Sequence, residues 1–160
     1  MNMTGIKDVI VRKATLDDYN ALLQFEQQLI SAERPFDPTL RRELIHYYDI
    51  KELIMSSNTC LAVAAREEQL IGCGYARIDM ARPWLKHERF SYLGFMYTVP
   101  EFRGQGVNYR IMESLKAWSV SRGIAEMRLE VYAGNIMAQK AYEKAGFSSH
   151  MIQMRVDLGK

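Results

Sequence analysis

The sequence has few of the residues that build metal sites or covalent scaffolds. Its 160 residues include only two cysteines and three histidines. Cys60 and Cys73 stand in apolar runs, where thiols are usually buried and reduced. Two cysteines make neither a disulfide framework nor a zinc site. Because His46, His87 and His150 are scattered along the chain, we expect no metal cluster and no histidine-based triad.

A strong charge bias and a long apolar run are also missing. Lys and Arg total 21 against 19 Asp and Glu, which gives a net charge of only +2. Such a balance does not indicate nucleic acid or a membrane as the main partner. Residues 1–15 contain no apolar block typical of a secretion signal, and no stretch approaches the length of a membrane span. We therefore expect a cytoplasmic protein.

Repeats, low-complexity segments and linkers are absent from the sequence as well. Proline occurs only four times, and 48% of the residues are hydrophobic, which is enough for a substantial core. A chain of 160 residues with this composition predicts a single domain over 1–160.

The segment 91–121 carries most of the functional information, and it predicts a strand, a glycine loop and a helix in that order. Aromatic and β-favouring residues fill 92–99, and Pro100 should end the strand because proline cannot donate to the ladder. Apolar residues recur at helical spacing over 111–118. Between them lies Arg103-Gly104-Gln105-Gly106.

A glycine loop before a helix suits a phosphate group. The first backbone amides of a helix have no partner inside it, and the macrodipole adds partial positive charge there. Other phosphate loops fit less well, because Tyr109 stands where the dinucleotide fingerprint needs its third glycine and no Gly-Lys-Ser/Thr follows. The alternative is a plain turn that caps the helix.

The segment Val99–Val107 resembles the acetyl-CoA loop of the GCN5-related N-acetyltransferases, the GNAT superfamily. The family pattern is Arg/Gln-x-x-Gly-x-Gly/Ala, and Arg103 to Val107 match it. Asn108 stands where the family has a small residue, and its side chain could crowd a pyrophosphate. This departure keeps open a second interpretation, a module that binds CoA without efficient transfer, and a third, a structural domain with an inert loop.

A second match follows at the family's spacing. Leu129-Glu130-Val131 leads to Asn135, then to Ala138 and Tyr142, and ends at Gly146-Phe147. The two motifs together cover the chain from about residue 91 onward.

The resemblance implies an α/β (α+β) fold. We expect a central, mixed and mostly antiparallel twisted sheet of six to seven strands, splayed at the acetyl-CoA site, with helices on both faces. It also implies transfer of acetyl from acetyl-CoA to a primary amine by direct attack, through a tetrahedral intermediate. The amine can belong to a small molecule or to a protein N-terminus, and a homodimer stays open.

The resemblance also implies which residues hold acetyl-CoA. The pantetheine arm would pair with one strand, the pyrophosphate would lie on the loop, and the next helix would approach the thioester. The expected contacts are Met96, Tyr97, Thr98, Arg103, Gly104, Gln105, Gly106, Val107, Asn108, Tyr109, Asn135 and Tyr142.

Two side chains are candidates for proton transfer. By resemblance Tyr142 is the general acid, and a phenol with a pKa of about 10 can protonate a thiolate whose thiol pKa is about 8.5. Glu130 is the first candidate base, because its surroundings resemble the bacterial ribosomal-protein alanine N-acetyltransferases. The alternatives are a packed tyrosine and an ordinary strand glutamate, with Glu101, Glu33 or a water chain as the base.

The first ninety positions predict elements without a sharp motif. We expect strands at 9–11, 61–65 and 70–78, and later ones at 127–131 and 148–157. Helices are expected after Thr15, over 39–48 with an uncertain short helix to 55, and over 136–144.

Two loops could touch a substrate. The segment 33–37 could line the acceptor pocket, or be a proline-stiffened solvent loop. The loop 79–88, with Arg77, Arg82, Lys86 and Arg89 in or beside it, could form a basic lip, although a solvated loop is the more common arrangement.

Overall fold

The computed structural model describes residues 6–159. The chain divides into two compact units, the first ending at Glu130 and the second starting at Val131. The single domain expected over 1–160 stays a prediction.

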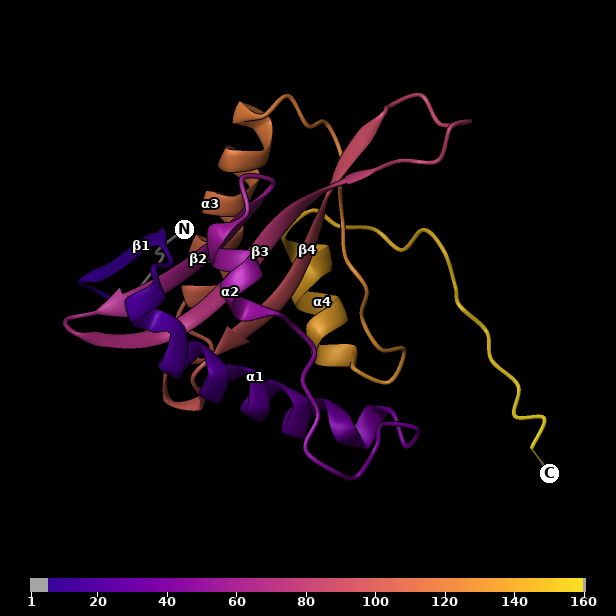
Figure 1. Ribbon diagram of the computed structural model, residues 1–160, viewed down its shortest axis with the longest axis horizontal. Helices are drawn as coiled ribbons and strands as arrows, with labels where there is room; N and C mark the ends of the chain where they lie inside the picture. Colours follow the sequence, from indigo (N-terminus) through magenta and orange to yellow (C-terminus); the bar gives the residue numbers. More distant parts are fainter. Residues whose placement is uncertain (1–5, 160) are drawn as a thin grey trace. The chain divides into compact units, whose positions relative to one another are not determined.

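The first unit is built on one twisted sheet of five strands (Figure 1). The strands are β1 (Val9–Lys13), β2 (Thr59–Arg66), β3 (Gln69–Met80), β4 (Arg89–Thr98) and β5 (Met127–Arg128). Their order follows the sequence; β1 to β4 are antiparallel, and β5 runs parallel to β4. The mixed, mostly antiparallel sheet is confirmed, whereas the expected six to seven strands are corrected to five.

Helices cover both faces of this sheet. Helices α1 (Tyr19–Glu33) and α2 (Ile50–Met55) pack on one face, and α3 (Val107–Ser121) packs on the other (Figure 1). The core under α1 and α2 contains Leu22, Phe25, Ile50, Leu53, Leu61, Val63, Tyr75 and Phe95. The second unit holds α4 (Ile136–Lys144) and an extended C-terminal segment.

The expected helix start at Thr15 is confirmed, with a short 3-10 turn before α1. The carboxylate of Asp18 accepts a hydrogen bond from the Thr15 amide at 2.8 Å. It also accepts two from the Arg12 guanidinium at 2.8 and 2.9 Å. The entry to α1 is therefore tied to β1.

The helix expected over 39–48 is wrong, since this stretch is irregular and the helix begins only at Ile50. Two carboxylates, one nearby in the sequence and one on α1, accept hydrogen bonds from amides that a helix would need. Asp37 accepts from the Thr39 amide at 2.9 Å, and Glu26 of α1 accepts from the amides of Tyr47 and Tyr48, each at 2.9 Å.

The strand expected over 148–157 is also wrong, because residues 147–159 form neither helix nor strand. Ile152, Met154, Val156 and Leu158 alternate as a half-buried strand would, yet they are 77 to 89% exposed. A strand requires a hydrogen-bonded neighbour, and within residues 6–159 this segment pairs with none.

Candidate functional site

Strand β4 has one open edge, which is the first element of the site. It pairs with β3 along its length, as far as Thr98 opposite Gly72. On the other side it pairs with β5 only at Ser91 and Tyr92. From residue 93 to 98 this edge therefore has no strand partner in the described part of the first unit. The expected splay is confirmed.

A bulge lies in the middle of the open edge. Between two pairs of the β3–β4 ladder, Cys73 opposite Tyr97 and Tyr75 opposite Gly94, β4 has one residue more than β3. Phe95 in this interval has a φ of 54°, a left-handed conformation that costs a non-glycine residue about 1–2 kcal/mol. Its carbonyl accepts a hydrogen bond from the Cys73 thiol at 3.4 Å. The bulge re-aims the backbone at this point of the strand.

Gly94 makes room for an aromatic side chain beside the bulge. A Cβ atom at this position would lie 2.5 Å from the ring and hydroxyl of Tyr75 on β3. Only glycine lets the Tyr75 ring lie directly over β4 here.

The glycine loop leads from β4 into α3. Gly104 and Gly106 have φ values of 74° and 85°, and an added Cβ would meet nothing within 4 Å. These glycines are therefore required by the backbone conformation and not by packing. The first helical hydrogen bond of α3 runs from the Arg110 amide to Gly106 O at 3.1 Å. The three preceding amides, 107–109, have no acceptor within the helix.

Two side chains fix this loop, one to the end of β4 and one to the turn that follows it. Arg103 Nε donates to Thr98 O at 3.1 Å, and Gln105 Nε2 donates to Glu101 O at 3.0 Å. Val107 is buried, Asn108 is half-buried in the first turn of α3, and Tyr109 is 45% exposed. The predicted loop residues are thus brought together at one helix N-terminus.

The three predicted strand residues turn their side chains in different directions. Met96 packs over Gly74, and Tyr97 packs on Phe25 of α1 with ring centroids 4.9 Å apart. The Tyr97 hydroxyl donates to Gln28, and burial, partly offset by Arg103, raises the pKa of the Tyr97 phenol. The Thr98 hydroxyl oxygen is buried and has no hydrogen-bond partner in the described chain.

Glu130 lies at the end of the first unit, beside a pair of tyrosines. Burial raises the pKa of Tyr92 and of Tyr75, and the negative charge of Glu130 raises both further. The two rings are 6.5 Å apart, and the Arg77 guanidinium lies over both, at 5.4 and 5.7 Å. The structure thus brings Glu130, an exposed carboxylate, to a polar aromatic face of the sheet.

Asn135 and Tyr142 belong to the second unit. Asn135 caps α4, because its side-chain oxygen accepts from the Ala138 amide at 3.2 Å. Tyr142 lies two turns further along α4, half-buried, with its ring edge-on to Phe147 at 6.0 Å. Their participation in a site with the glycine loop stays a prediction.

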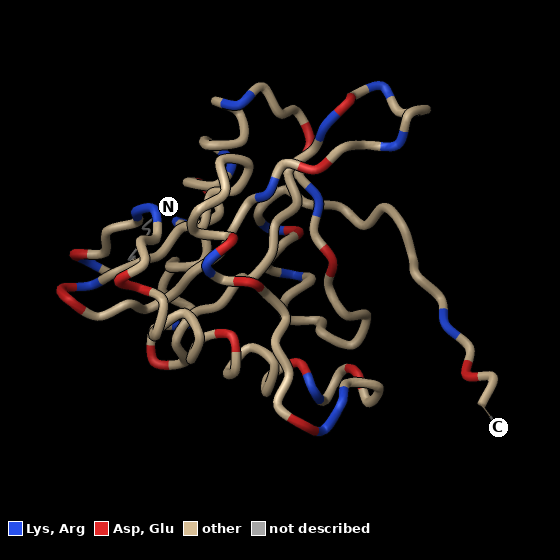
Figure 2. Tube along the Cα trace, viewed as in Figure 1, with Lys and Arg blue, Asp and Glu red and all other residues tan. Residues whose placement is uncertain are grey.

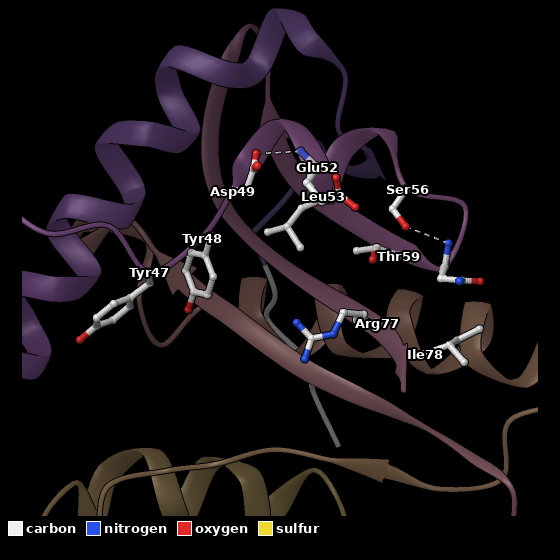
Figure 3. A pocket seen from close by; sticks show the side chains of 10 residues that line it. Tyr47, Tyr48, Asp49, Glu52, Leu53, Ser56, Thr59, Arg77 and Ile78 are labelled. Carbon is white, nitrogen blue, oxygen red and sulfur yellow. Dashed lines mark hydrogen bonds between the residues drawn. The ribbon is translucent and has the colours of Figure 1, made fainter. Parts of the chain in front are cut away.

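A cavity of about 370 Å³ lies on the face covered by α1 and α2, and sequence reasoning missed it. Its lining comprises Tyr47, Tyr48, Asp49, Glu52, Leu53, Ser56, Asn58, Thr59, Arg77 and Ile78. Figure 3 shows the Tyr47 and Tyr48 rings beside each other and the Arg77 guanidinium turned toward them. The adjacent Tyr47 and Tyr48 were the sequence signal for this cavity, but they fell within the helix expected over 39–48.

The weaker candidates for the base lie apart from one another. Glu33, at the end of α1, is half-buried; burial raises its pKa, and a hydrogen bond from Tyr47 lowers it. Glu101 is exposed in the turn after β4, and His150 is exposed in the second unit. Glu33 is the candidate nearest the cavity, since its hydrogen-bond partner Tyr47 lines it.

The basic residues around 79–88 do not form one cluster. Arg77 pairs with Asp79 at 2.8 Å, Arg82 lies over the Trp84 ring at 5.8 Å, and Arg89 Nη2 donates to Arg122 O at 3.3 Å. Figure 2 shows both signs of charge interleaved along the chain. These contacts support a solvated loop more than a basic lip.

Neither a metal cluster nor a membrane-spanning helix occurs among the described residues. Among residues 6–159, no group of three or more His, Cys, Asp or Glu side chains could hold a metal ion. No helix in the same range combines the length and the apolar character needed to cross a bilayer.

The comparisons with known proteins agree with this geometry. The model of the Acetyltransferase (GNAT) family matches residues 22–147, which is most of the chain. The chain therefore belongs to the GNAT family of acetyltransferases.

Two curated relatives carry acetyltransferase names. Streptothricin acetyltransferase from Escherichia coli is 28% identical over 82 residues, which are 51% of this chain and 43% of that protein. Aminoglycoside N(6')-acetyltransferase type 1 from Stenotrophomonas maltophilia is 26% identical over 90 residues, 54% of this chain and 57% of that protein. The matches thus span about half the length of these relatives.

Solved structures share the fold at lower identity. A point mutant of the BH1408 protein from Bacillus halodurans has a TM-score of 0.85 at 18% identity, covering 93% of this chain and 99% of that one. A predicted acetyltransferase from Clostridium acetobutylicum, solved with acetyl-CoA, has a TM-score of 0.73 at 19% identity, covering 94% and 96%.

Proposed function

We propose that this chain is an acetyl-CoA-dependent N-acetyltransferase that acts on a primary amine of a small molecule or of a protein N-terminus. One observation carries the proposal. The open edge of β4 leads directly into a left-handed glycine loop at the start of α3, within one compact unit.

The residues present fit acetyl-CoA. An extended chain with amide groups, such as pantetheine, can pair with the open backbone of residues 93–98 as an added strand does. The Thr98 hydroxyl, buried and without a partner, is available to such a chain. The amides at the start of α3 suit a pyrophosphate, and the Arg103 guanidinium lies beside them.

The relatives support an amine acceptor. One is named for streptothricin and the other for aminoglycosides, and the named enzymes transfer acetyl groups to such compounds. In this chain we place the acceptor in the cavity beside Tyr48, on the same face as Tyr75 and Phe95.

The chemistry we propose is direct transfer. The amine nitrogen forms a bond to the acetyl carbon, the carbon–sulfur bond breaks, and the thiolate takes a proton. Glu130 would accept the proton from the amine, and its place beside Tyr92 and Tyr75 supports that role. Tyr142 would supply the proton to sulfur, a role that rests on the sequence motif. Bulge amides facing the developing oxyanion would contribute a large catalytic term.

Asn108 supports one other function, a CoA-binding module without efficient transfer. Its half-buried side chain in the first turn of α3 is larger than the Gly or Ala of the family pattern. Tight acetyl-CoA binding by the wild-type protein, with no transfer to a broad panel of amines, would favour this alternative.

The test is a calorimetric titration of acetyl-CoA into matched variants. Asn108→Glu adds a negative charge where helices favour it, so the fold is retained, but the charge repels a pyrophosphate. Asn108→Gln is the neutral control of similar size. We expect on the order of tenfold weaker binding for Asn108→Glu than for Asn108→Gln.

The outcomes separate the interpretations. Equal affinity in the two variants would place the pyrophosphate away from α3 and contradict the proposed site. No binding by the wild-type protein would leave the third interpretation, a domain with an inert loop. Tighter binding by Asn108→Ala would show that the asparagine side chain crowds the ligand.

A further inference from the structure

A buried carboxylate fixes the segment that precedes α2. Glu26 on α1 is fully buried, and a carboxylate in such a place is costly unless it is hydrogen-bonded. Its Oε2 accepts from the amides of Tyr47 and Tyr48, each at 2.9 Å, and its Oε1 lies 2.7 Å from His46 Nδ1. Three consecutive residues outside any helix are therefore held by one side chain of α1.

The residue held most directly against β4 is Tyr48. Its ring stacks on Phe95 with centroids 4.6 Å apart and an angle of 23°, and lies edge-on to Tyr75 at 5.8 Å. Phe95 is the left-handed residue of the bulge. Burial, the largest effect, raises the pKa of the Tyr48 phenol well above its usual value, and the neighbouring Phe95 backbone group opposes the rise.

Tyr48 also lines the cavity proposed for the acceptor, together with Tyr47 and Arg77 (Figure 3). One side chain thus contacts both the cavity and the bulge. Tyr47 differs from Tyr48, since its ring packs on Tyr48 at 5.8 Å and its hydroxyl lies near the Glu33 carboxylate.

We infer that Tyr48, anchored by Glu26, is a positioning residue that holds the β4 bulge in the orientation needed for acetyl transfer. The inference rests on the proposed function and adds a role for residues outside both sequence motifs. Tyr48 acts through the backbone at Phe95, whose left-handed conformation sets the direction of the peptide groups that follow along the open edge. Loss of its hydroxyl should therefore lower turnover more than cosubstrate binding.

The first variant to measure is Tyr48→Phe, which keeps the stacked ring and removes the hydroxyl. Tyr19→Phe is the matched control. Tyr19 lies on α1, is half-buried against the same core, and is far from the bulge in the sequence. We expect kcat to fall about tenfold in Tyr48→Phe, which is less than the loss of an oxyanion donor would cost. KM for acetyl-CoA should change less than about twofold. Tyr19→Phe should keep wild-type kcat.

Glu26 provides a second pair of variants. Glu26→Gln keeps one oxygen for the amides of Tyr47 and Tyr48, and we expect it to retain most of kcat. Glu26→Ala removes that oxygen and should lower kcat as Tyr48→Phe does. Equal kcat in the two Glu26 variants would contradict the anchoring role.

A third readout needs no turnover and separates this inference from the proposed function. Amide hydrogen exchange over 95–98 in the ligand-free protein should be faster in Tyr48→Phe than in Tyr19→Phe. Unchanged exchange together with unchanged kcat would overturn the inference. A wild-type protein that binds no acetyl-CoA would instead contradict the proposed function, and the exchange result would still decide the role of Tyr48.

Discussion

At the scale of single residues, Thr98 combines two properties that are rarely found together. It ends β4 beside the glycine loop, and its buried hydroxyl has no partner among the described residues. A buried polar group without a hydrogen bond costs about 1–3 kcal/mol, so natural proteins keep few of them. The hydroxyl therefore suggests a ligand contact.

Thr98→Val tests this interpretation. Valine has the same shape without the hydroxyl, so the ligand-free protein should gain roughly 1 kcal/mol, a rise in Tm of about 2–4 °C. Acetyl-CoA should bind more weakly, which calorimetry measures. Thr59→Val is the control, because Thr59 is also buried on the sheet but lies opposite Arg77, at the other end of β3 from the Gly72–Thr98 pair, and it should leave acetyl-CoA affinity unchanged. An unchanged affinity in Thr98→Val would exclude the contact.

At the scale of elements, the start of α1 depends on one carboxylate. The hydrogen bonds from Arg12, the largest effect, hold the pKa of Asp18 below its usual value of 3.8, although burial opposes them. Because the folded-state pKa is the lower one, the stabilisation is complete above the unfolded pKa. It is lost as the pH falls through the folded pKa.

Asp18→Asn should therefore destabilise the protein in a pH-dependent way. We expect a loss of about 1–3 kcal/mol in the free energy of unfolding at pH 7, measured by urea denaturation, and a difference that shrinks progressively as the pH falls below 3.8. Asp17→Asn changes an exposed carboxylate of the same turn and should stay within about 0.5 kcal/mol. A loss that does not change with pH would point to packing instead of charge.

Elements with a local signal could be predicted from the sequence. The strands, the turn before α3 and α4 with its Asn135 cap follow from alternation, glycine and capping residues. The irregular stretch before α2 could not be predicted, because its amides donate to Glu26, which lies more than twenty residues earlier in the sequence. The alternation of apolar residues over 148–157 predicted a strand. A strand also needs a second strand to pair with, and the sequence does not show whether one is present.

The site also combines features that could be predicted from the sequence with features that could not. The loop 103–106 and the open edge of β4 follow from the motif and from the family's fold. The bulge at Phe95 has no glycine to mark it, and its left-handed backbone arises from packing between β3, β4 and Tyr48. The cavity likewise depends on contacts between distant segments.

At the scale of the whole molecule, the residues proposed from the two sequence motifs belong to different units. Acetyl-CoA would bind to the first unit, whereas the proposed acid, Tyr142, lies on α4 of the second. Tyr142→Phe should lower kcat on the order of a hundredfold, the typical effect of a general acid, and leave acetyl-CoA affinity nearly unchanged. Steady-state kinetics and calorimetry on the same preparation measure both. Equal losses in turnover and affinity would instead assign Tyr142 to binding.

The two thiols described above make the protein suited to site-specific labelling. Cys60 and Cys73 are buried, and burial raises the pKa of each, well above the usual value for Cys73. The thiolate that reacts with maleimide dyes is therefore scarce and shielded. A cysteine introduced at Glu68, in the exposed turn after β2, or at Gln153 would therefore carry the dye at one chosen position of the first or the second unit.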